Sequence, residues 1–470
     1  MKFVKAFLPM LACCTGLLYA QPRPTATQQA WHQQEFYLFM HFGPNTFTGK
    51  EWGHGDEKTE VFNPTALDTE QWCRVAKAAG ATGIIITAKH HDGFCLWPSA
   101  YSTHTVRESK WRNGKGDVLK ELSASCRKWG LKFGVYLSPW DRNHPSYGTP
   151  AYNDVYANTL KEIFANYGPI WELWWDGANG EGPNGKRQVY DFPRFEKLVR
   201  QLSPNTVIFS DIGPDTRWVG NESGIAGTTN WNTLDTAGFQ RGQGGPPTDT
   251  LNSGNRYGRH WIPAECDVSI RPGWFYHAEE DGKVKSGETL FQLYLKSVGR
   301  GANLLLNVPP DTRGLIHEND SAALVGFAQL RQQLDGKRQL AATATLLQHN
   351  IKKQVTALLD QDLKTGVQIA LPAVSSVALD FAKPTTLNCM LLAEDLRQGQ
   401  AVAAFTLKLY DDKGELLRSV AGTTIGQKRL LTFAATTASR VVLEITDTNK
   451  LPVQLASMQA YLLPAQLVEK

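Results

Sequence analysis

The sequence contains few cysteines, and none has the spacing that a metal site or a disulfide framework would require. Of its seven cysteines, Cys13 and Cys14 lie in an apolar N-terminal run, and the other five form no CxxC pair. Five is an odd number, so a complete disulfide framework is not expected, and no zinc-ligand pattern is present. We expect these five residues to be buried free thiols.

Three further absences exclude whole classes of protein. The formal net charge is only +4, and Lys and Arg are scattered rather than clustered, so a nucleic-acid partner is not expected. Beyond residue 20 no apolar run approaches the length that spans a bilayer. Neither a repeat with a fixed period nor a low-complexity tract is present. The chain therefore has the composition of a globular protein, and its 470 residues suggest two domains.

The first 20 residues have the pattern of a secretory signal. Lys2 and Lys5 precede the apolar run Ala6–Leu18, and Ala20 ends a small-residue cleavage site before Gln21. A lipoprotein signal is the alternative, but Met10-Leu11-Ala12 before Cys13 fits a lipobox poorly. We expect residues 1–20 to be removed and the protein to be exported in soluble form, to a periplasmic or extracellular space.

From residue 35 to about residue 310, short apolar runs alternate with helical patterns, as in a parallel sheet with crossover helices. Eight such runs predict a (β/α)8 barrel over residues 21–338. After about residue 340 Trp disappears, and alternating runs around turns such as Asp411–Gly414 predict a C-terminal all-β sandwich over residues 339–470. The eight predicted barrel strands are Glu35–Gly43, Gly83–Lys89, Lys132–Ser138, Ile170–Gly177, Thr206–Asp211, Thr228–Asn232, His260–Glu265 and Ala302–Val308.

Two of the intervening helices have recognisable ends. Asp68 is placed to cap a helix, with Gln71 three residues further on and Gly80 at its end. Asp117 is placed to cap a second helix, and Gly130 stands at the position after that helix. These helices are predicted to be scaffold.

The predicted strand ends carry an unusual number of polar and aromatic side chains. The active site of a (β/α)8 barrel lies at the C-terminal ends of its strands. Here those ends are His41-Phe42-Gly43, Lys89-His90-His91-Asp92-Gly93, Tyr136, and Trp174-Trp175-Asp176-Gly177. The chain also has 14 tryptophans. Indole rings stack on the apolar faces of sugars, so this composition favours a carbohydrate-binding cleft.

Glycoside cleavage requires two carboxyl groups. Asp176 directly follows two tryptophans at a strand end, where an ionised carboxylate can face a bound sugar ring. For the second group the candidates are Asp211, Glu222 and Glu265. Glu222 lies near Trp218 in a Gly-flanked loop, and an apolar neighbour raises the pKa of a carboxyl group, as a general acid requires.

These motifs resemble, in order, those of glycoside hydrolase family 29, the α-L-fucosidases. The resemblance covers roughly residues 28–335, and it rests on His41–Gly43, Glu51-Trp52, Lys89–Phe94, Trp174–Gly177 and Asn303–Asn307. It implies a barrel followed by a β-sandwich, and a retaining double displacement on a terminal fucose of an oligosaccharide or glycoconjugate.

The resemblance also implies roles for individual residues. Asp176 matches the nucleophile of the family. Arg217–Gly224 is similar to the motif of the subgroup acting on α-1,3/1,4-linked fucose, which assigns Glu222 as general acid/base. The residues that match fucose-binding positions are His41, Glu51, Trp52, His90, His91, Tyr136 and Trp174. Around them, Trp140, Trp218 and Trp274 are candidates for binding the rest of the glycan, with loop packing as the alternative for Trp140 and Trp274.

No metal or cofactor is expected. Zinc-binding barrel hydrolases are the rival interpretation of the three histidines, but the first strand has no His-x-His pair. His90 and His91 are adjacent on an extended chain and point in opposite directions. Two further alternatives are a fucosidase of relaxed specificity for α-1,2 or α-1,6 links, and a carbohydrate-binding protein with a decayed catalytic pair. Both carboxylates of that pair are present.

Overall fold

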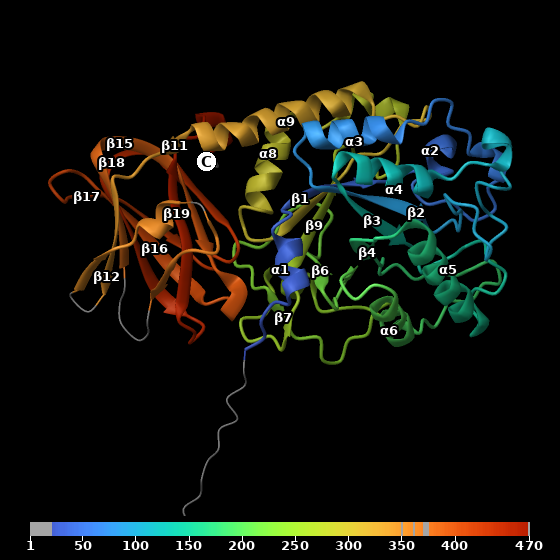
Figure 1. Ribbon diagram of the computed structural model, residues 1–470, viewed down its shortest axis with the longest axis horizontal. Helices are drawn as coiled ribbons and strands as arrows, with labels where there is room; N and C mark the ends of the chain where they lie inside the picture. The colour runs from blue at the N-terminus through green and yellow to red at the C-terminus, as the bar shows by residue number, and fades with distance from the viewer. Residues whose placement is uncertain (1–20, 349–350, 361, 370–375, 469–470) are drawn as a thin grey trace, which may run out of the picture.

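The computed structural model describes residues 21–348, 351–360, 362–369 and 376–468. Figure 1 shows a barrel surrounded by helices on one side and an all-β domain on the other, with the long helix α9 (Glu318–Gly336) leading from the first to the second. The predicted secretory signal lies outside the described residues. In the described part of the chain, no helix is both long and apolar enough to cross a membrane.

Eight parallel strands form the closed barrel, in the order β1-β2-β3-β4-β5-β6-β9-β10 with β10 pairing back to β1. The predicted parallel barrel is therefore confirmed. A two-stranded sheet, β7 (Thr233–Leu234) with β8 (His260–Trp261), lies outside it. The barrel strands are β1 (Phe36–Met40), β2 (Gly83–Lys89), β3 (Lys132–Leu137), β4 (Glu172–Trp174), β5 (Val207–Ser210), β6 (Thr216–Trp218), β9 (Ala264–Ser269) and β10 (Asn303–Asn307).

The helices begin and end where the local sequence specifies. The side chain of Asp68 accepts from the backbone of Gln71 at the start of α3, and Asp117 accepts from Lys120 at the start of α4. Gly130 ends α4 with φ 64°, a conformation that glycine adopts without strain. Besides α9, the helices are α1 (Ala26–His32), α2 (Asn45–Thr48), α3 (Thr69–Ala78), α4 (Val118–Trp129), α5 (Ala151–Tyr167), α6 (Phe192–Leu202), α7 (Thr248–Ser253) and α8 (Gly287–Lys296).

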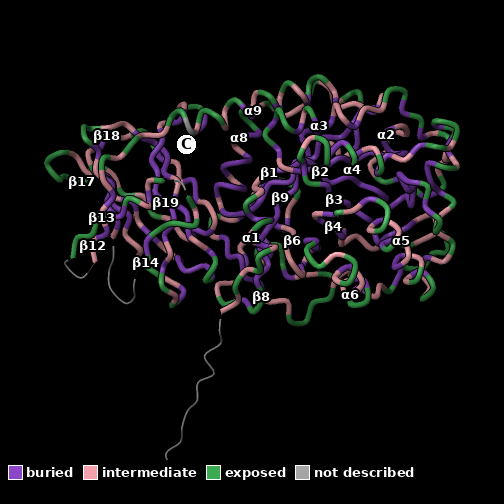
Figure 2. Tube along the Cα trace, in the orientation of Figure 1, coloured by how far each residue is buried: buried purple, intermediate pink, exposed green. Residues whose placement is uncertain are grey.

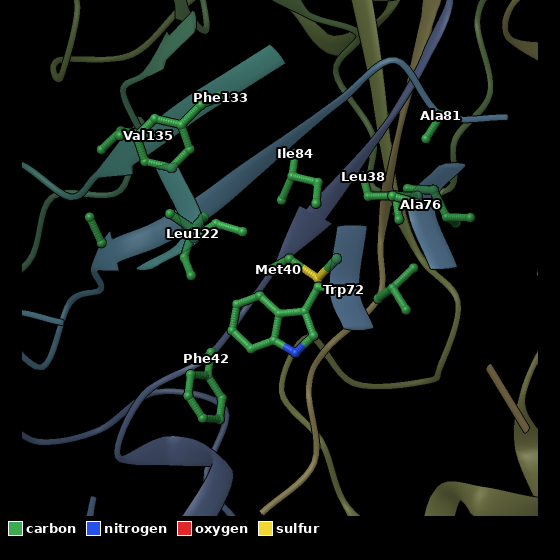
Figure 3. Packing of buried hydrophobic residues seen from close by; sticks show 14 of the residues in the cluster. Leu38, Met40, Phe42, Trp72, Ala76, Ala81, Ile84, Leu122, Phe133 and Val135 are labelled. Carbon is green, nitrogen blue, oxygen red and sulfur yellow. The ribbon is translucent and has the colours of Figure 1, made fainter. Parts of the chain in front are cut away.

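Alternate residues of the barrel strands enter two different cores. On β1, Leu38 and Met40 pack outward with Trp72 of α3, and Figure 3 shows this layer between strands and helices. Tyr37 and Phe39 instead enter the barrel interior. Figure 2 shows buried chain through both domains and exposed chain on the outer helices and turns. The inner layer matters for function because it forms the floor of the site described below.

The sixth barrel strand is not the one predicted. Thr228–Asn232 lies outside the barrel, and the sixth strand is Thr216–Trp218. This strand has only three residues, and its central residue is charged, so a search for apolar runs passes over it. Arg217 is fully buried, and its guanidinium donates to the carbonyl oxygens of Leu251 (2.9 Å) and Trp231 (3.0 Å).

The predicted strand His260–Glu265 is also divided in the structure. His260–Trp261 pairs with Thr233–Leu234 outside the barrel, and the barrel strand itself runs from Ala264 to Ser269. Pro263 separates the two segments, and a proline cannot donate a ladder hydrogen bond.

The C-terminal domain is antiparallel, as predicted, and two very long strands carry the chain between its two layers. β15 (Ser376–Glu394) and β18 (Arg429–Thr448) pair along their length, with register shifts near Asp380 and Leu387. On one side of its bend β15 pairs with β12, and on the other with β19. The other strands are β11 (Arg338–Gln339), β12 (Thr343–Gln348), β13 (Ile351–Gln354), β14 (Val367–Ile369), β16 (Val402–Tyr410), β17 (Leu416–Gly422) and β19 (Val453–Tyr461).

Polar side chains join the two domains. Gln400 accepts from the backbone of Asn232 at 2.9 Å and donates to the carbonyl oxygen of Asn230 at 3.0 Å. Lys428 forms a partly buried ion pair with Glu35, the residue directly before β1. The β domain is thus bonded to the N-terminal end of β1 and to the connection between β6 and β9.

Cys73, Cys95, Cys126, Cys266 and Cys389 are free and buried, as the sequence predicts.

Candidate active site

A cavity of about 150 Å³ opens at the C-terminal ends of the barrel strands. Ten of the residues predicted from the sequence line it, and they come from segments between Phe39 and Trp274 that are far apart in the chain. The complete lining is Phe39, His41, Glu51, Trp52, His90, His91, Tyr136, Trp174, Asp176, Ala178, Glu222, Asp267 and Trp274.

Asp176 is held by two donors on one side of this cavity. Its Oδ2 accepts a 2.9 Å hydrogen bond from the hydroxyl of Tyr136, and its Oδ1 accepts from the backbone of Ala178 at 2.8 Å. Burial, and then the Asp176 carboxylate, raise the pKa of Tyr136 well above its usual value, so the phenol stays protonated and donates. Hydrogen bonds to both oxygens fix the orientation of the carboxylate.

His41 is fixed by the amide of Asn307 at the end of β10. Asn307 donates through Nδ2 to Ser269 Oγ (2.9 Å) and to the carbonyl oxygen of Trp274 (2.8 Å). Its Oδ1 is therefore the atom 2.8 Å from His41 Nδ1, and that nitrogen carries the proton. The other ring nitrogen of His41 is then an acceptor.

His91 has its tautomer set in the same way. The hydroxyl of Ser138 donates to the carbonyl oxygen of Trp140 at 2.8 Å, so its oxygen accepts from His91 Nδ1, also at 2.8 Å. This leaves His91 Nε2 without a proton, 3.7 Å from Asp176 Oδ2. An unprotonated nitrogen beside a carboxylate is suited to accept a hydrogen bond from a hydroxyl of a bound molecule.

The three histidines of the cavity are uncharged near neutral pH. Burial lowers the pKa of His41 to about 3 and that of His91 to about 4, and it holds the pKa of His90 well below its usual value. Within the described ranges, no group of three or more His, Cys, Asp or Glu residues is arranged to hold a metal ion. Neutral imidazoles in a small cavity are suited to hydrogen bonding with hydroxyl groups.

Glu222 stands on a tight turn after β6. Gly220 and Gly224 both have positive φ, +86° and +71°, and a Cβ at Gly224 would come within 2.7 Å of Val268. Between them, Asn221 Oδ1 accepts from the backbone of Ser223 at 3.1 Å. The two glycines that flank Glu222 in the sequence therefore allow a turn that carries the exposed Glu222 to the cavity.

Glu51 positions the tryptophan that reaches Glu222. Its Oε2 accepts from the backbone of Trp274 at 2.7 Å, and its Oε1 lies 2.6 Å from His277 Nε2. The indole Nε1 of Trp274 then donates to Glu222 Oε2 at 3.3 Å. The two cavity carboxylates Glu51 and Glu222 are thus joined through one tryptophan.

The other two candidates for the second carboxyl group lie outside the cavity lining. Glu265 is fully buried below it, where Oε1 accepts from Trp174 Nε1 at 2.8 Å. Asp211 lies against Gly177, where a Cβ would meet its Oδ2 at 2.0 Å. Burial, followed by the charge of Asp176, raises the pKa of Asp211 to about 7. Of the three candidates named from the sequence, Glu222 is the one that lines the cavity with Asp176.

The predicted outer tryptophans divide into two groups. Trp274 lines the cavity, whereas Trp140 and Trp218 do not. Trp140 is buried behind His91, with ring centroids 4.9 Å apart, and it forms an edge contact with Trp52. Trp52 lines the cavity and is 53% exposed.

A family model for α-L-fucosidases matches residues 19–332 of this chain. The chain belongs to the α-L-fucosidase family. It is therefore a glycoside hydrolase with α-L-fucosidase activity.

Several α-L-fucosidases are similar over most of the chain. Alpha-L-fucosidase 1 of Arabidopsis thaliana is 41% identical over 441 residues, which is 91% of this chain and 85% of the plant protein. A glycoside hydrolase 29 family member from an unknown rumen bacterium is 39% identical, with a TM-score of 0.82, over 96% of this chain and 80% of that one. A Ruminococcus gnavus GH29 fucosidase in complex with fucose is 28% identical, with a TM-score of 0.83, over 96% and 97%.

Sequence reasoning missed several residues of this fucosidase site. Phe39, Ala178 and Asp267 also line the cavity. Asn307 fixes the ring of His41 by a hydrogen bond. In the sequence, the motif Asn303–Asn307 that contains it served only as a marker of the family. Asp267 could have been found, because it stands two residues after Glu265 on the same strand, and alternate residues of a barrel strand face the interior.

Proposed function

We propose that this α-L-fucosidase acts as a retaining exo-enzyme in which Asp176 is the nucleophile and Glu222 the general acid/base. The observation that carries the proposal is that both side chains line one small cavity. A volume of about 150 Å³ is below the ~300–1,000 Å³ of drug-sized ligand sites, which suits a single terminal sugar.

In the first step, Asp176 attacks the anomeric carbon while Glu222 protonates the departing glycosidic oxygen. Water then hydrolyses the fucosyl ester, and Glu222 takes its proton, so the configuration is retained. The donor from Tyr136 orients the attacking carboxylate. Trp274 donates to Glu222 and can stabilise the carboxylate form between the two steps.

Recognition of fucose requires hydroxyl partners and an apolar surface, because this 6-deoxy sugar has no charge. The acceptor nitrogens assigned to His41 and His91, with His90, Glu51 and Tyr136, supply hydrogen-bonding groups. Trp174 and Phe39 supply apolar surface, and Trp174 stacks on Phe209 with ring centroids 4.0 Å apart.

For the linkage, we propose α-1,3/1,4-fucosyl branches of Lewis-type glycans. The loop Arg217–Gly224 that resembles the subgroup motif carries Glu222, and the exposed ring of Trp52 at the rim is placed to contact a neighbouring sugar. Relaxed specificity for α-1,2 or α-1,6 links remains the second candidate, favoured by the exposure of Glu222 to solvent.

A linkage panel tests the proposed function. Purified protein is given a Lewis-type trisaccharide, an α-1,2-fucosyllactose and an α-1,6-fucosylated core, and free fucose is measured together with its anomeric form at early times. We expect the branched substrate to be cleaved fastest, with retained configuration. Equal rates on all three would favour relaxed specificity, and inverted fucose would exclude the double displacement.

We also propose that the mature protein is exported, because the N-terminal 20 residues have the composition of a secretory signal.

A further inference from the structure

Asp267 is a further carboxyl group in the cavity that Asp176, Glu222 and Glu51 also line. It stands near the C-terminal end of β9, two residues after the buried Glu265, and so faces the barrel interior one layer closer to the opening. Its side chain lines the cavity, yet the residue is only 4% exposed. Neither the family motifs nor the two-carboxyl scheme of the reaction requires a carboxyl group at this position.

The hydrogen bonds of Asp267 leave one oxygen available. Oδ1 accepts a 2.9 Å hydrogen bond from the indole Nε1 of Trp218. Among the described residues, no second side chain donates to this carboxyl group, and the only other protein donor beside it is its own backbone N–H, which partly offsets the rise in its pKa. Trp218 belongs to the short strand that leads to the Glu222 turn, so the accepting oxygen ties β9 to that strand. The Asp267 side chain forms part of the cavity wall. A molecule bound in the cavity is therefore the partner within reach of its second oxygen.

Solvation decides which carboxyl group among Asp176, Glu222 and Asp267 is most easily kept neutral. The side chain of Asp176 is 26% exposed and Glu222 is exposed, whereas Asp267 is almost completely buried. Removing a charge from water is costly, and several nearby carboxylates do not all ionise together. Burial, and then the charge of Glu222, raise the pKa of Asp267 well above its usual value.

The other titratable groups around Asp267 do not reverse this balance. Glu265 lies below it on the same strand and adds to the same effect. In the same cavity, His41 and His91 are neutral near pH 7 because burial lowers the pKa of each. The cavity lining contains no lysine or arginine that could hold Asp267 in its charged form.

We propose that Asp267 is a substrate-binding residue that works as a neutral carboxylic acid, accepting from Trp218 with one oxygen and donating from the other to an oxygen of the bound fucose. This inference rests on the proposed function of the site. A neutral acid supplies a hydrogen-bond donor in a cavity where His41 and His91 offer acceptor nitrogens. It also avoids placing another negative charge beside Glu222 at the stage when that residue has given up its proton.

Two substitutions separate a neutral acid from a carboxylate. Asp267→Asn keeps an acceptor for Trp218 and supplies an N–H donor without charge, whereas Asp267→Ala removes both. We expect Asp267→Ala to weaken binding of L-fucose and to lower kcat/KM for an aryl fucoside at least tenfold more than Asp267→Asn does. Binding is followed by calorimetry with L-fucose itself, which requires no turnover. Asp412→Ala, on an exposed turn of the β domain, is the matched control.

A spectroscopic readout tests the protonation directly. Infrared difference spectra at neutral pH between the wild type and Asp267→Asn should show the C=O band of a protonated carboxylic acid lost in the variant. This band reports the protonation of Asp267, whereas the fucose affinities of the two variants report its contact with the ligand. Thermal unfolding of each variant accompanies the measurements, so that loss of folding is recognised.

Each outcome has one consequence. Equal losses in Asp267→Asn and Asp267→Ala, or loss of a carboxylate band instead, would show that the charged form is used and would overturn the inference. Fucose affinity and kcat/KM that match the control in both variants would also overturn it, because no contact would exist. If instead the wild type neither binds L-fucose nor cleaves any fucoside, the proposed function itself fails, which is a different result.

Discussion

The hydroxyl of Tyr136 donates a 2.9 Å hydrogen bond to Oδ2 of Asp176, across the ends of two neighbouring barrel strands. β3 and β4 place Tyr136 directly beside Trp174 in the ladder, so the sheet register brings the phenol within reach of the carboxylate two residues later. The bond is charge-assisted, and the raised pKa of Tyr136 keeps its proton in place near neutral pH.

Removing this hydroxyl tests its contribution. We expect Tyr136→Phe to lower kcat/KM by about 10- to 100-fold, because a hydrogen bond to a charged group contributes ~1.5–3 kcal/mol. Tyr156→Phe is the matched control, since that hydroxyl donates at 2.8 Å to the carbonyl oxygen of Leu137 at the end of the same strand, β3, away from the cavity. Loss of activity in the control equal to that in Tyr136→Phe would mean that the effect is structural.

The nucleophile is tested by replacement and rescue. Asp176→Gly should lower turnover by orders of magnitude, and azide should restore it by forming a fucosyl azide of configuration opposite to that of the substrate. Product configuration is read by NMR. Turnover near that of the wild type in Asp176→Gly would remove the assignment.

Glu222 is tested through the leaving group. A poor leaving group needs protonation as the bond breaks, whereas a good one departs unaided. Glu222→Ala should therefore lower kcat/KM on natural glycans by about 10²–10⁴-fold and spare aryl fucosides with acidic leaving groups. A loss of the same size on both substrates would move the acid role elsewhere, with Asp211 the next carboxyl group to replace.

Chelation tests the interpretation of the histidines. His41 and His91 each direct Nδ1 to a neighbouring oxygen, of Asn307 and Ser138, and burial keeps both rings neutral. We expect EDTA to leave kcat/KM unchanged. Activity that is lost on chelation and recovered with zinc would make these histidines metal ligands.

The buried carboxyl group of Asp92 makes the free energy of unfolding depend on pH. It is buried, its Oδ1 accepts from the backbone of Phe94 at 2.7 Å, and burial raises its pKa to about 7. Between about pH 4 and pH 7 the folded state holds a proton that the unfolded state has released. The free energy of unfolding from this group therefore falls as the pH rises through this window, by about 1.4 kcal/mol per pH unit at most.

Comparison of the wild type with Asp92→Asn isolates the contribution of Asp92 to the pH dependence of stability, because the other buried groups contribute equally to both proteins. Urea unfolding at three pH values between about 4.5 and 6.5 gives the difference in unfolding free energy. We expect the advantage of the wild type to shrink as the pH rises. A difference that does not change with pH would mean that Asp92 is ionised in the folded state.

Much of this protein could be predicted from local patterns in its sequence. The caps at Asp68 and Asp117 need only residues within one turn, and the strand-end motifs carry their chemistry in consecutive residues. A parallel barrel brings the C-terminal ends of its strands together whatever the details of packing. For that reason His41, Tyr136 and Asp176 could be assigned to one site before any contact was known.

Other features were decided by the tertiary structure. β6 is only three residues long with Arg217 at its centre, and it becomes a strand because carbonyl oxygens of distant segments accept from the buried guanidinium. No local pattern encodes those partners. The protonation of Asp267 is decided in the same way, because it depends on burial and on the neighbouring charge of Glu222, which a loop from another strand supplies. The sequence determines which ionisable side chains the protein contains. Only the packing of the folded chain determines how far each of them is removed from solvent.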